Sequence, residues 1–136
     1  MDIRAASAED YTFLLENDRH IRPGELRLSL EQGRVLLIRR GAERIGWLRW
    51  NLFWDNTPFM NLLYILEGHR KEGFGGQLMA CWERQMRAAG HKLVMTSTRS
   101  DEQAQHFYRK AGYVDCGSLL LPGEPLEILF RKDTGT

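Results

Sequence analysis

The chain has 136 residues, of which 19 are lysine or arginine and 18 are aspartate or glutamate. This length is enough to bury a core without a disulfide or a metal, so we expect one domain over residues 1–136. The near balance of charge gives no reason to expect a nucleic acid or a membrane surface as partner. We find neither a secretion signal nor an apolar run of membrane-spanning length, and therefore expect a cytoplasmic protein.

The first third of the chain predicts two helices. Ser7, followed three residues later by Asp10, is typical of a helix start and predicts a helix over residues 8–17. Residues 25–32 predict a second, shorter helix that ends at a glycine. The leucines of this second segment alternate along the sequence, which also allows a strand.

Three β-type runs follow, over residues 35–39, 45–53 and 59–66. They are rich in apolar and aromatic residues, and turn-forming residues separate them. Runs of this length at this spacing predict an antiparallel meander of three strands.

The second half of the chain alternates between segments with the hydrophobic periodicity of a helix and segments with that of a strand. Residues 75–89 and 102–111 predict helices, whereas residues 93–97, 113–121 and 126–131 predict strands. Antiparallel strands, a helix, a strand, a helix and a final hairpin make an α+β fold. We expect its central sheet to be mixed but mostly antiparallel.

The two cysteines, Cys81 and Cys116, and the four histidines show no metal-ligand spacing. Cys81 falls in a helical pattern and Cys116 in a strand-like run. We expect both to be small, buried or half-buried thiols in a reducing compartment, and we expect no bound metal.

A glycine-rich loop at residues 70–76 joins the third predicted strand to the next helix. Glycines permit positive φ and let an anion approach the backbone, and a helix start offers unpaired N–H groups with a partial positive charge. Such a loop is suited to a phosphate. A dinucleotide fingerprint is excluded because Leu78 stands where its third glycine is required, and the Lys-Ser/Thr of a P-loop is absent. A purely structural turn remains open on this segment alone.

The pattern Arg70-x-x-Gly73-x-Gly75 resembles the Arg/Gln-x-x-Gly-x-Gly/Ala signature of the GNAT acetyltransferase superfamily, whose loop binds the pyrophosphate of acyl-CoA. The segment from Ala104 to Tyr113 is similar to that family's Ala-x-x-apolar-Tyr-x-x-x-Gly-Phe/Tyr pattern. The resemblance implies a single-domain GNAT-like fold with a twisted sheet splayed at the CoA site and flanked by about four helices. It also implies an N-acetyltransferase that uses acetyl-CoA as co-substrate.

The resemblance further implies roles for individual residues. The backbone of Ile65 and Leu66 would pair with pantetheine, amides of residues 70–76 would hold the pyrophosphate, and Tyr108 would face the thioester sulfur as general acid. The implied cofactor contacts are Ile65, Leu66, Arg70, Lys71, Gly73, Phe74, Gly75, Gly76, Gln77, Asp101 and Tyr108.

Two acidic residues depart from the family pattern. Asp101 stands where many members have asparagine, and Glu72 stands at a position that is often basic. A carboxylate beside a pyrophosphate would repel it, so we expect Glu72 to point outward, with Lys71 compensating for its charge.

The expected reaction is direct attack of a primary amine on the thioester in a ternary complex. A lysine-like amine has a pKa of about 10.4, so making it neutral at pH 7 costs roughly 4–5 kcal/mol. Positioning the two reactants contributes as much as about 7–11 kcal/mol in favourable cases, which exceeds that cost. A phenol has a pKa of about 10 and a thiol about 8.5, so we expect Tyr108 to hydrogen-bond the sulfur with partial proton transfer.

The acceptor site is less clearly marked. Strand alternation places Trp47 and Phe53 on one face of the second β-type run and Trp50 and Trp54 on the other. One pair should be core, and the other can line a pocket for an apolar or cationic acceptor. No general base is identified, although Asp55 and Glu67 are the nearby carboxylates. The candidate acceptor contacts are Trp50, Trp54, Asp55, Asn61 and Glu67.

Two other classes of function stay open at this point: a catalytically inactive acyl-CoA-binding sensor or partner domain, and a scaffold domain without a CoA site. The acceptor can be a small-molecule or a peptide amine, and the protein a monomer or a homodimer.

Overall fold

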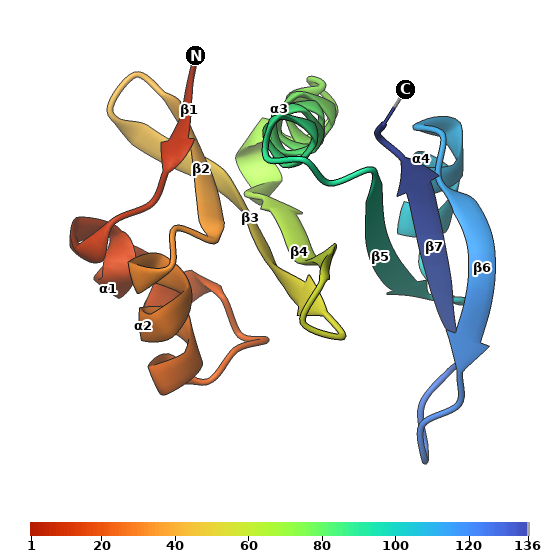
Figure 1. The fold of residues 1–136 in the computed structure, drawn as a ribbon. Coiled ribbons are helices and arrows are strands. Elements are labelled where there is room, and N and C mark those ends of the chain that lie inside the picture. Colours follow the sequence, from red (N-terminus) through yellow and green to blue (C-terminus); the bar gives the residue numbers. More distant parts are fainter. Residues whose placement is uncertain (136) are drawn as a thin grey trace. The chain divides into compact units, whose positions relative to one another are not determined.

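The computed structural model describes residues 1–135 and has the expected α+β architecture (Figure 1). The helices are α1 (Tyr11–Asn17), α2 (Pro23–Glu31), α3 (Phe74–Ala88) and α4 (Ala104–Lys110), with 3₁₀ turns at Ala8–Asp10 and Glu67–His69. The strands are β1 (Asp2–Ala5), β2 (Val35–Arg40), β3 (Glu43–Phe53), β4 (Thr57–Ile65), β5 (Leu93–Arg99), β6 (Val114–Leu119) and β7 (Glu127–Asp133).

The seven strands form one sheet in the order β1-β2-β3-β4-β5-β7-β6. The β1–β2, β2–β3, β5–β7 and β6–β7 pairs are antiparallel, whereas β4 and β5 are parallel. The parallel register covers Phe59 with Met95 and Met60 with Thr96. The predicted mixed, mostly antiparallel sheet is therefore confirmed.

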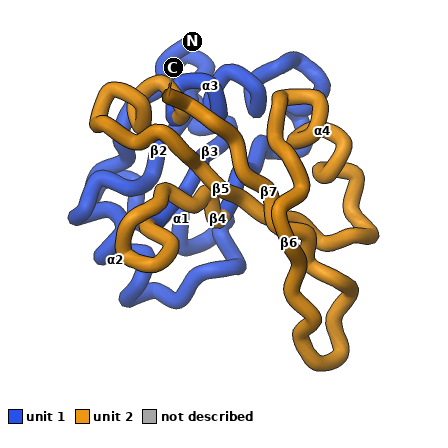
Figure 2. Tube along the Cα trace, turned by 45° about the vertical axis from the view of Figure 1, so that its right-hand side comes forward, with its two compact units in different colours: residues 1–51, 62–82 blue, residues 52–61, 83–136 orange. Residues whose placement is uncertain are grey.

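The chain divides into two compact units (Figure 2). Unit 1 comprises residues 1–51 and 62–82, and unit 2 comprises residues 52–61 and the chain from residue 83 on. The strands β3 and β4 and the helix α3 each contribute residues to both units.

Residues 25–31, for which the sequence allowed a helix or a strand, belong to the helix α2 in the core of unit 1. In α2, Leu26 and Leu30 are buried, whereas Leu28 is 48% exposed. Burial at a spacing of four with exposure between is the pattern of a helix, because a strand would bury all three alternating leucines. Pro23 occupies the first turn of α2, where its missing N–H removes no hydrogen bond. The helix packs into a cluster that includes Leu14, Val35, Leu37 and Trp47.

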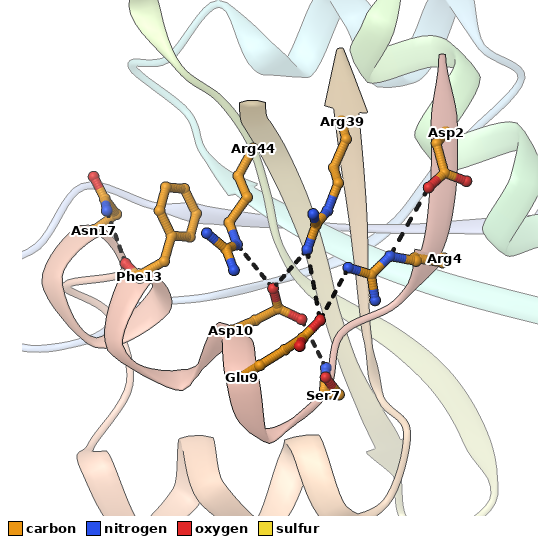
Figure 3. A network of polar contacts seen from close by, with 9 residues as sticks. All are labelled: Asp2, Arg4, Ser7, Glu9, Asp10, Phe13, Asn17, Arg39 and Arg44. Carbon is orange, nitrogen blue, oxygen red and sulfur yellow. Dashed lines mark hydrogen bonds and ion pairs between the residues drawn. The ribbon is translucent and has the colours of Figure 1, made fainter. Parts of the chain in front are cut away.

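Two buried carboxylates join the N-terminal segment of unit 1 to its strands. Asp10 accepts hydrogen bonds from Arg44 Nε at 2.8 Å, Arg39 Nη2 at 3.2 Å and the Ser7 N–H at 2.9 Å (Figure 3). Burial alone would raise the Asp10 pKa, but the Ser7 N–H and the Arg44 guanidinium outweigh it, so the pKa lies below its ordinary value. The predicted pairing of Ser7 with Asp10 thus belongs to a wider network.

Asp18, also buried, accepts from Arg49 Nε at 2.9 Å and from Trp47 Nε1 at 3.2 Å. The carboxylate follows α1 and its partners lie on β3, so this network fixes the end of α1 against the sheet of unit 1. A buried arginine is stable only with a partner, which makes Asp18 and Arg49 dependent on each other.

The core of unit 2 is aromatic. Tyr108 of α4 lies 5.9 Å from Phe130 of β7 and 5.8 Å from Tyr113, between ring centroids. The Tyr113 hydroxyl donates to Glu83 at 2.8 Å, and Lys132 donates to the other oxygen of the same carboxylate at 2.9 Å. Burial and the Glu83 carboxylate both raise the Tyr113 pKa.

Several predicted bounds are wrong. The strand β1 was not predicted, and the first predicted helix is divided into a 3₁₀ turn and α1. The predicted helix over residues 102–111 begins two residues later, at Ala104. Cys116 is exposed on β6 rather than buried. Among residues 1–135, no helix is long and apolar enough to cross a membrane.

Candidate active site

The glycine-rich loop lies in unit 1, between the end of β4 and the start of α3. A 3₁₀ turn at Glu67–His69 leads into it, and α3 begins at Phe74. Lys71 and Gly73 have φ angles of 65° and 84°. Alternating positive and negative φ turns successive N–H groups toward one side, which produces an anion-binding concavity.

The backbone of this loop is accessible. A Cβ atom placed on Gly73 or on Gly76 would meet no atom within 4 Å. The first N–H groups of α3 have no intrahelical acceptor and lie at the positive end of the helix dipole. Open backbone and unpaired donors fit a pyrophosphate, so the chemistry of the loop agrees with the predicted cofactor site.

Arg70 turns back toward the strand that precedes the loop. Its Nε donates to the Ile65 carbonyl at 2.7 Å, and its guanidinium carbon lies 5.1 Å from the centre of the Tyr64 ring. The side chain thus closes the turn between β4 and the loop. Of the predicted loop residues, Lys71, Gly73 and Gln77 are exposed, and Phe74 is buried.

Ile65 and Leu66, whose backbone is predicted to pair with pantetheine, lie at the end of β4. The Leu66 N–H donates to the Ile45 carbonyl at 2.8 Å, and the Leu66 carbonyl accepts from the His69 N–H at 2.9 Å. Both backbone groups of Leu66 are therefore used within unit 1. Peptide groups of successive residues point to opposite edges of a strand, so those of Ile65 point away from β3. The Ile65 carbonyl is likewise engaged, by Arg70 Nε at 2.7 Å, so backbone pairing of Ile65 and Leu66 with pantetheine stays a prediction.

Glu72 is exposed, and its carboxylate lies 2.8 Å from Arg40 Nη2. The guanidinium carbon of Arg40 lies 4.8 Å from the centre of the Phe74 ring. Arg40 is the last residue of β2 and was not among the predicted site residues. Its only sequence signal is that it is basic and ends a strand, which is too general to identify it.

Tyr108 lies in unit 2 and is 7% exposed. Its phenol is hydrogen-bonded to the side chain of Thr96, whose hydroxyl donates to the Met60 carbonyl at 2.8 Å. Burial raises the Tyr108 pKa to about 12, and the Thr96 hydrogen bond acts in the opposite direction. The phenol therefore keeps its proton at neutral pH, and Thr96 fixes its orientation.

Asp101, also in unit 2, accepts from Arg99 Nη2 at 3.0 Å and from Arg99 Nε at 3.2 Å. The carboxylate raises the pKa of Arg99 through this hydrogen bond and its charge. Both side chains are about half exposed. Asp101, which stands where many family members have asparagine, thus uses its carboxylate to bind Arg99.

The expectation that Trp50 and Trp54 share a strand face is wrong. β3 ends at Phe53, and Trp54 and Asp55 form the β3–β4 turn with φ angles of 55° and 65°. Two consecutive positive φ angles are typical of a type I′ hairpin turn, which ends the alternation of faces. Trp54 is 82% exposed at this turn in unit 2, whereas Trp50 packs in unit 1 with a centroid separation of 6.4 Å from Trp82.

The other candidate acceptor contacts are exposed. Asp55 lies in the β3–β4 turn, Asn61 on β4 and Glu67 in the 3₁₀ turn before the loop. Asp55 and Asn61 belong to unit 2 and Glu67 to unit 1. Among residues 1–135, no group of three or more His, Cys, Asp or Glu side chains is placed to hold a metal ion.

Comparison with known proteins gives a consistent result. Residues 31–115 match the family described as "Acetyltransferase (GNAT) domain", which spans both the loop and Tyr108. No curated protein sequence is a significant match.

Solved structures share the fold at low sequence identity. The ribosomal-protein-alanine N-acetyltransferase from Brucella melitensis has a TM-score of 0.80 at 18% identity, covering 98% of this chain and 99% of that one. The PaiA N-acetyltransferase from Thermoplasma acidophilum, in complex with coenzyme A, has a TM-score of 0.82 at 16% identity, covering 97% and 98%. A GNAT family acetyltransferase from Elizabethkingia anophelis with acetyl-CoA bound has a TM-score of 0.76 at 19% identity, covering 97% of each chain.

Proposed function

The chain belongs to the GNAT acetyltransferase family, and on that premise we propose that it transfers an acetyl or other short acyl group from acyl-CoA to a primary amine. The observation that carries the proposal is the loop of residues 70–76. Its positive φ angles at Lys71 and Gly73 and its open backbone at Gly73 and Gly76 suit a pyrophosphate at the start of α3.

In this proposal the amides of residues 70–76 hold the pyrophosphate, and the backbone of Ile65 pairs with pantetheine. Acetyl-CoA supplies an activated acyl group, and the protein supplies position and electrostatics. The amine attacks the thioester carbonyl directly, its C–N bond forms, and the C–S bond breaks to release CoA. No covalent acyl-enzyme is required.

Tyr108 serves this reaction as a hydrogen-bond donor to the departing sulfur. With the Tyr108 pKa raised to about 12, complete proton transfer to a thiolate is uphill by roughly 5 kcal/mol relative to a thiol pKa of about 8.5. Hydrogen bonding in the transition state has no such cost and still stabilises the developing negative charge. The proton that the sulfur finally acquires then comes from the acceptor amine or from water.

The proposed acceptor site is the β3–β4 turn. The exposed Trp54 and the neighbouring Asp55 suit a cationic or amphipathic amine, because an aromatic face and a carboxylate both attract cations. Trp50, Asn61 and Glu67 are secondary candidates. A Trp54→Ala variant should raise the KM for the acceptor while leaving the Kd for acetyl-CoA unchanged; an unchanged acceptor KM would remove Trp54 from the acceptor site.

The deciding experiment combines binding with turnover. Acetyl-CoA is titrated by isothermal calorimetry, and CoA release is then measured with small amines, peptide N-termini and lysine peptides. We expect saturable binding and release that depends on one class of amine. Binding without amine-dependent release would favour an acyl-CoA-binding sensor domain. An absence of binding at millimolar acetyl-CoA, with no rise in melting temperature, would contradict any CoA-dependent function.

A further inference from the structure

The loop of residues 70–76 contains a carboxylate that ought to oppose its proposed ligand. Glu72 contributes a negative charge within the segment whose amides are proposed to hold a pyrophosphate. Its carboxylate is paired with Arg40 at 2.8 Å, and this contact joins residues 32 positions apart in the sequence. Both side chains are partly exposed to solvent, at 46% for Arg40 and 43% for Glu72.

Arg40 has a second anchor that does not depend on Glu72. Its guanidinium carbon lies 4.8 Å from the centre of the Phe74 ring, and Phe74 is 4% exposed at the first position of α3. A guanidinium stacked on an aromatic face is held by cation–π attraction and retains its hydrogen-bond donors at the rim. The positive charge of Arg40 is thus held beside the same helix end as the amides of the loop.

The other cations of the loop do not serve in the same way. Arg70 donates its Nε to the Ile65 carbonyl and lies over the Tyr64 ring, so it is directed toward β4. Lys71 is exposed and offers a point charge on a flexible stem. Arg40 is therefore the arginine whose charge is both held at the start of α3 and paired only with an exposed carboxylate.

An exposed ion pair is readily exchanged for a stronger one. Solvent-exposed pairs contribute little to stability, whereas arginine and phosphate form short, charge-assisted and often bidentate hydrogen bonds. A phosphate that arrives at the loop therefore competes favourably with Glu72 for the guanidinium of Arg40.

From these contacts we propose that Arg40 is a further cofactor-binding residue, a ligand for a phosphate of acyl-CoA, and that Glu72 is its resident competitor. Glu72 holds Arg40 beside the loop, and a phosphate of the cofactor displaces Glu72 from Arg40. The inference rests on the proposed function, and it explains why an acidic residue is tolerated at a position where the family pattern is often basic.

The test is the dissociation constant of CoA, measured by calorimetry for four proteins. Arg40→Gln should weaken binding about 5- to 20-fold, because one charge-assisted contact is lost. Glu72→Gln should tighten binding about two- to fivefold, because the competitor is removed. Arg27→Gln is the matched control: Arg27 is exposed and lies 4.2 Å from the Tyr11 ring, the same kind of stacked arginine on α2. Its CoA affinity should equal that of the unmodified protein.

The sign of the Glu72→Gln effect separates the proposal from a purely structural role. If the pair only holds the loop in shape, removing either partner should weaken CoA binding, so weaker or unchanged binding by Glu72→Gln would overturn the inference. Equal affinities of Arg40→Gln and Arg27→Gln would also overturn it. Melting curves without ligand check that all variants fold. If the unmodified protein binds CoA, these failures leave the proposed function intact; if it does not bind CoA, both proposals fail.

Binding of a second ligand shows which phosphate of CoA contacts Arg40. Dephospho-CoA lacks the 3′-phosphate but keeps the pyrophosphate. The same loss with Arg40→Gln for both ligands would assign Arg40 to the pyrophosphate, and a loss confined to CoA would assign it to the 3′-phosphate.

Discussion

Thr96 and Tyr108 form a hydrogen-bonded pair in the interior of unit 2, with Thr96 on β5 and Tyr108 on α4. The Thr96 hydroxyl also bonds the Met60 carbonyl at 2.8 Å, so the pair is linked to β4. This contact positions the Tyr108 side chain in the interior of unit 2.

Tyr108→Phe removes the phenol and should lower kcat about 10- to 100-fold, at the modest end of acid–base contributions, because full proton transfer is not required. Acetyl-CoA affinity and the melting temperature should change little. Because the Tyr108 pKa is raised to about 12, its protonated form persists across the working range, and kcat/KM should show no alkaline decline from Tyr108 below about pH 11. A pH–rate profile checks this, and a decline centred near pH 9 would contradict it.

Gly76→Ala should separate stability from binding. Gly76 lies in the first turn of α3 and has no atom within 4 Å of the position of a Cβ. Alanine favours the helix by about 0.5–1 kcal/mol, so the unliganded protein should be slightly more stable to urea. The added methyl group occupies space in front of the first-turn amides, and the Kd for CoA should rise severalfold. A variant that is more stable and binds CoA equally well would place the phosphate elsewhere.

Gly46→Ala should destabilise unit 1. A Cβ at Gly46 on β3 would lie 2.7 Å from the Tyr64 carbonyl oxygen and 2.5 Å from Ile65 Cδ1. The Ile65 side chain can move but the carbonyl of a paired strand cannot, so we expect a loss of about 1–3 kcal/mol in urea unfolding. Gly24→Ala is the control, since a Cβ there meets no atom within 4 Å. Equal stabilities of the two variants would show that the close approach is not present in solution.

Asp10→Asn should cost about 3–5 kcal/mol, because it leaves Arg44 and Arg39 without their buried carboxylate. The pH dependence follows from the lowered Asp10 pKa. A carboxyl with a depressed pKa in the folded state contributes stability above its unfolded pKa of about 3.9 and loses it as the pH falls through the folded value. The unmodified protein should therefore lose stability relative to Asp10→Asn as the pH falls below about 4, and a constant difference would contradict this assignment.

Substitutions in the β3–β4 turn should raise the stability of the protein and weaken its binding of the acceptor. Trp54 and Asp55 both have positive φ, where asparagine and glycine are preferred. The double change Trp54→Asn and Asp55→Gly should raise stability by about 1 kcal/mol, because it relieves backbone strain and removes little buried surface beyond the contact of Trp54 with Phe53. The same change should raise the acceptor KM. A variant with improved stability and an unaltered acceptor KM would leave the turn as a structural feature alone.

Local pattern was sufficient for much of the fold and for the position of the glycine-rich loop. The position of Gly73 after a strand and before a helix predicted the loop, and the spacing around Tyr108 placed it on a helix. The short, mixed-polarity β1 has too few residues for a periodicity, so it was missed. Trp54 was assigned to a strand face because nothing in its residue type predicts a positive φ.

The long-range contacts of the site were inaccessible to sequence reasoning. Arg40 and Glu72 meet only because the end of β2 and the loop before α3 belong to the same unit. The sequence gives Thr96 no feature that separates it from other strand threonines, and its role depends on the hydrogen bond to Tyr108 of α4. Contacts between side chains that are distant in the sequence depend on which elements the fold brings together. The periodicity of a single sequence does not predict them.

The distribution of the four tryptophans also gives the protein an intrinsic optical probe. Trp47 and Trp82 are fully buried, Trp50 is half-buried, and Trp54 is 82% exposed. The water-exposed indole should supply the red edge of the fluorescence emission and nearly all of its sensitivity to iodide. An acceptor that covers the β3–β4 turn should then shift the emission to shorter wavelength and protect Trp54 from quenching by iodide. Classes of acceptor can therefore be compared by fluorescence, without an assay of product.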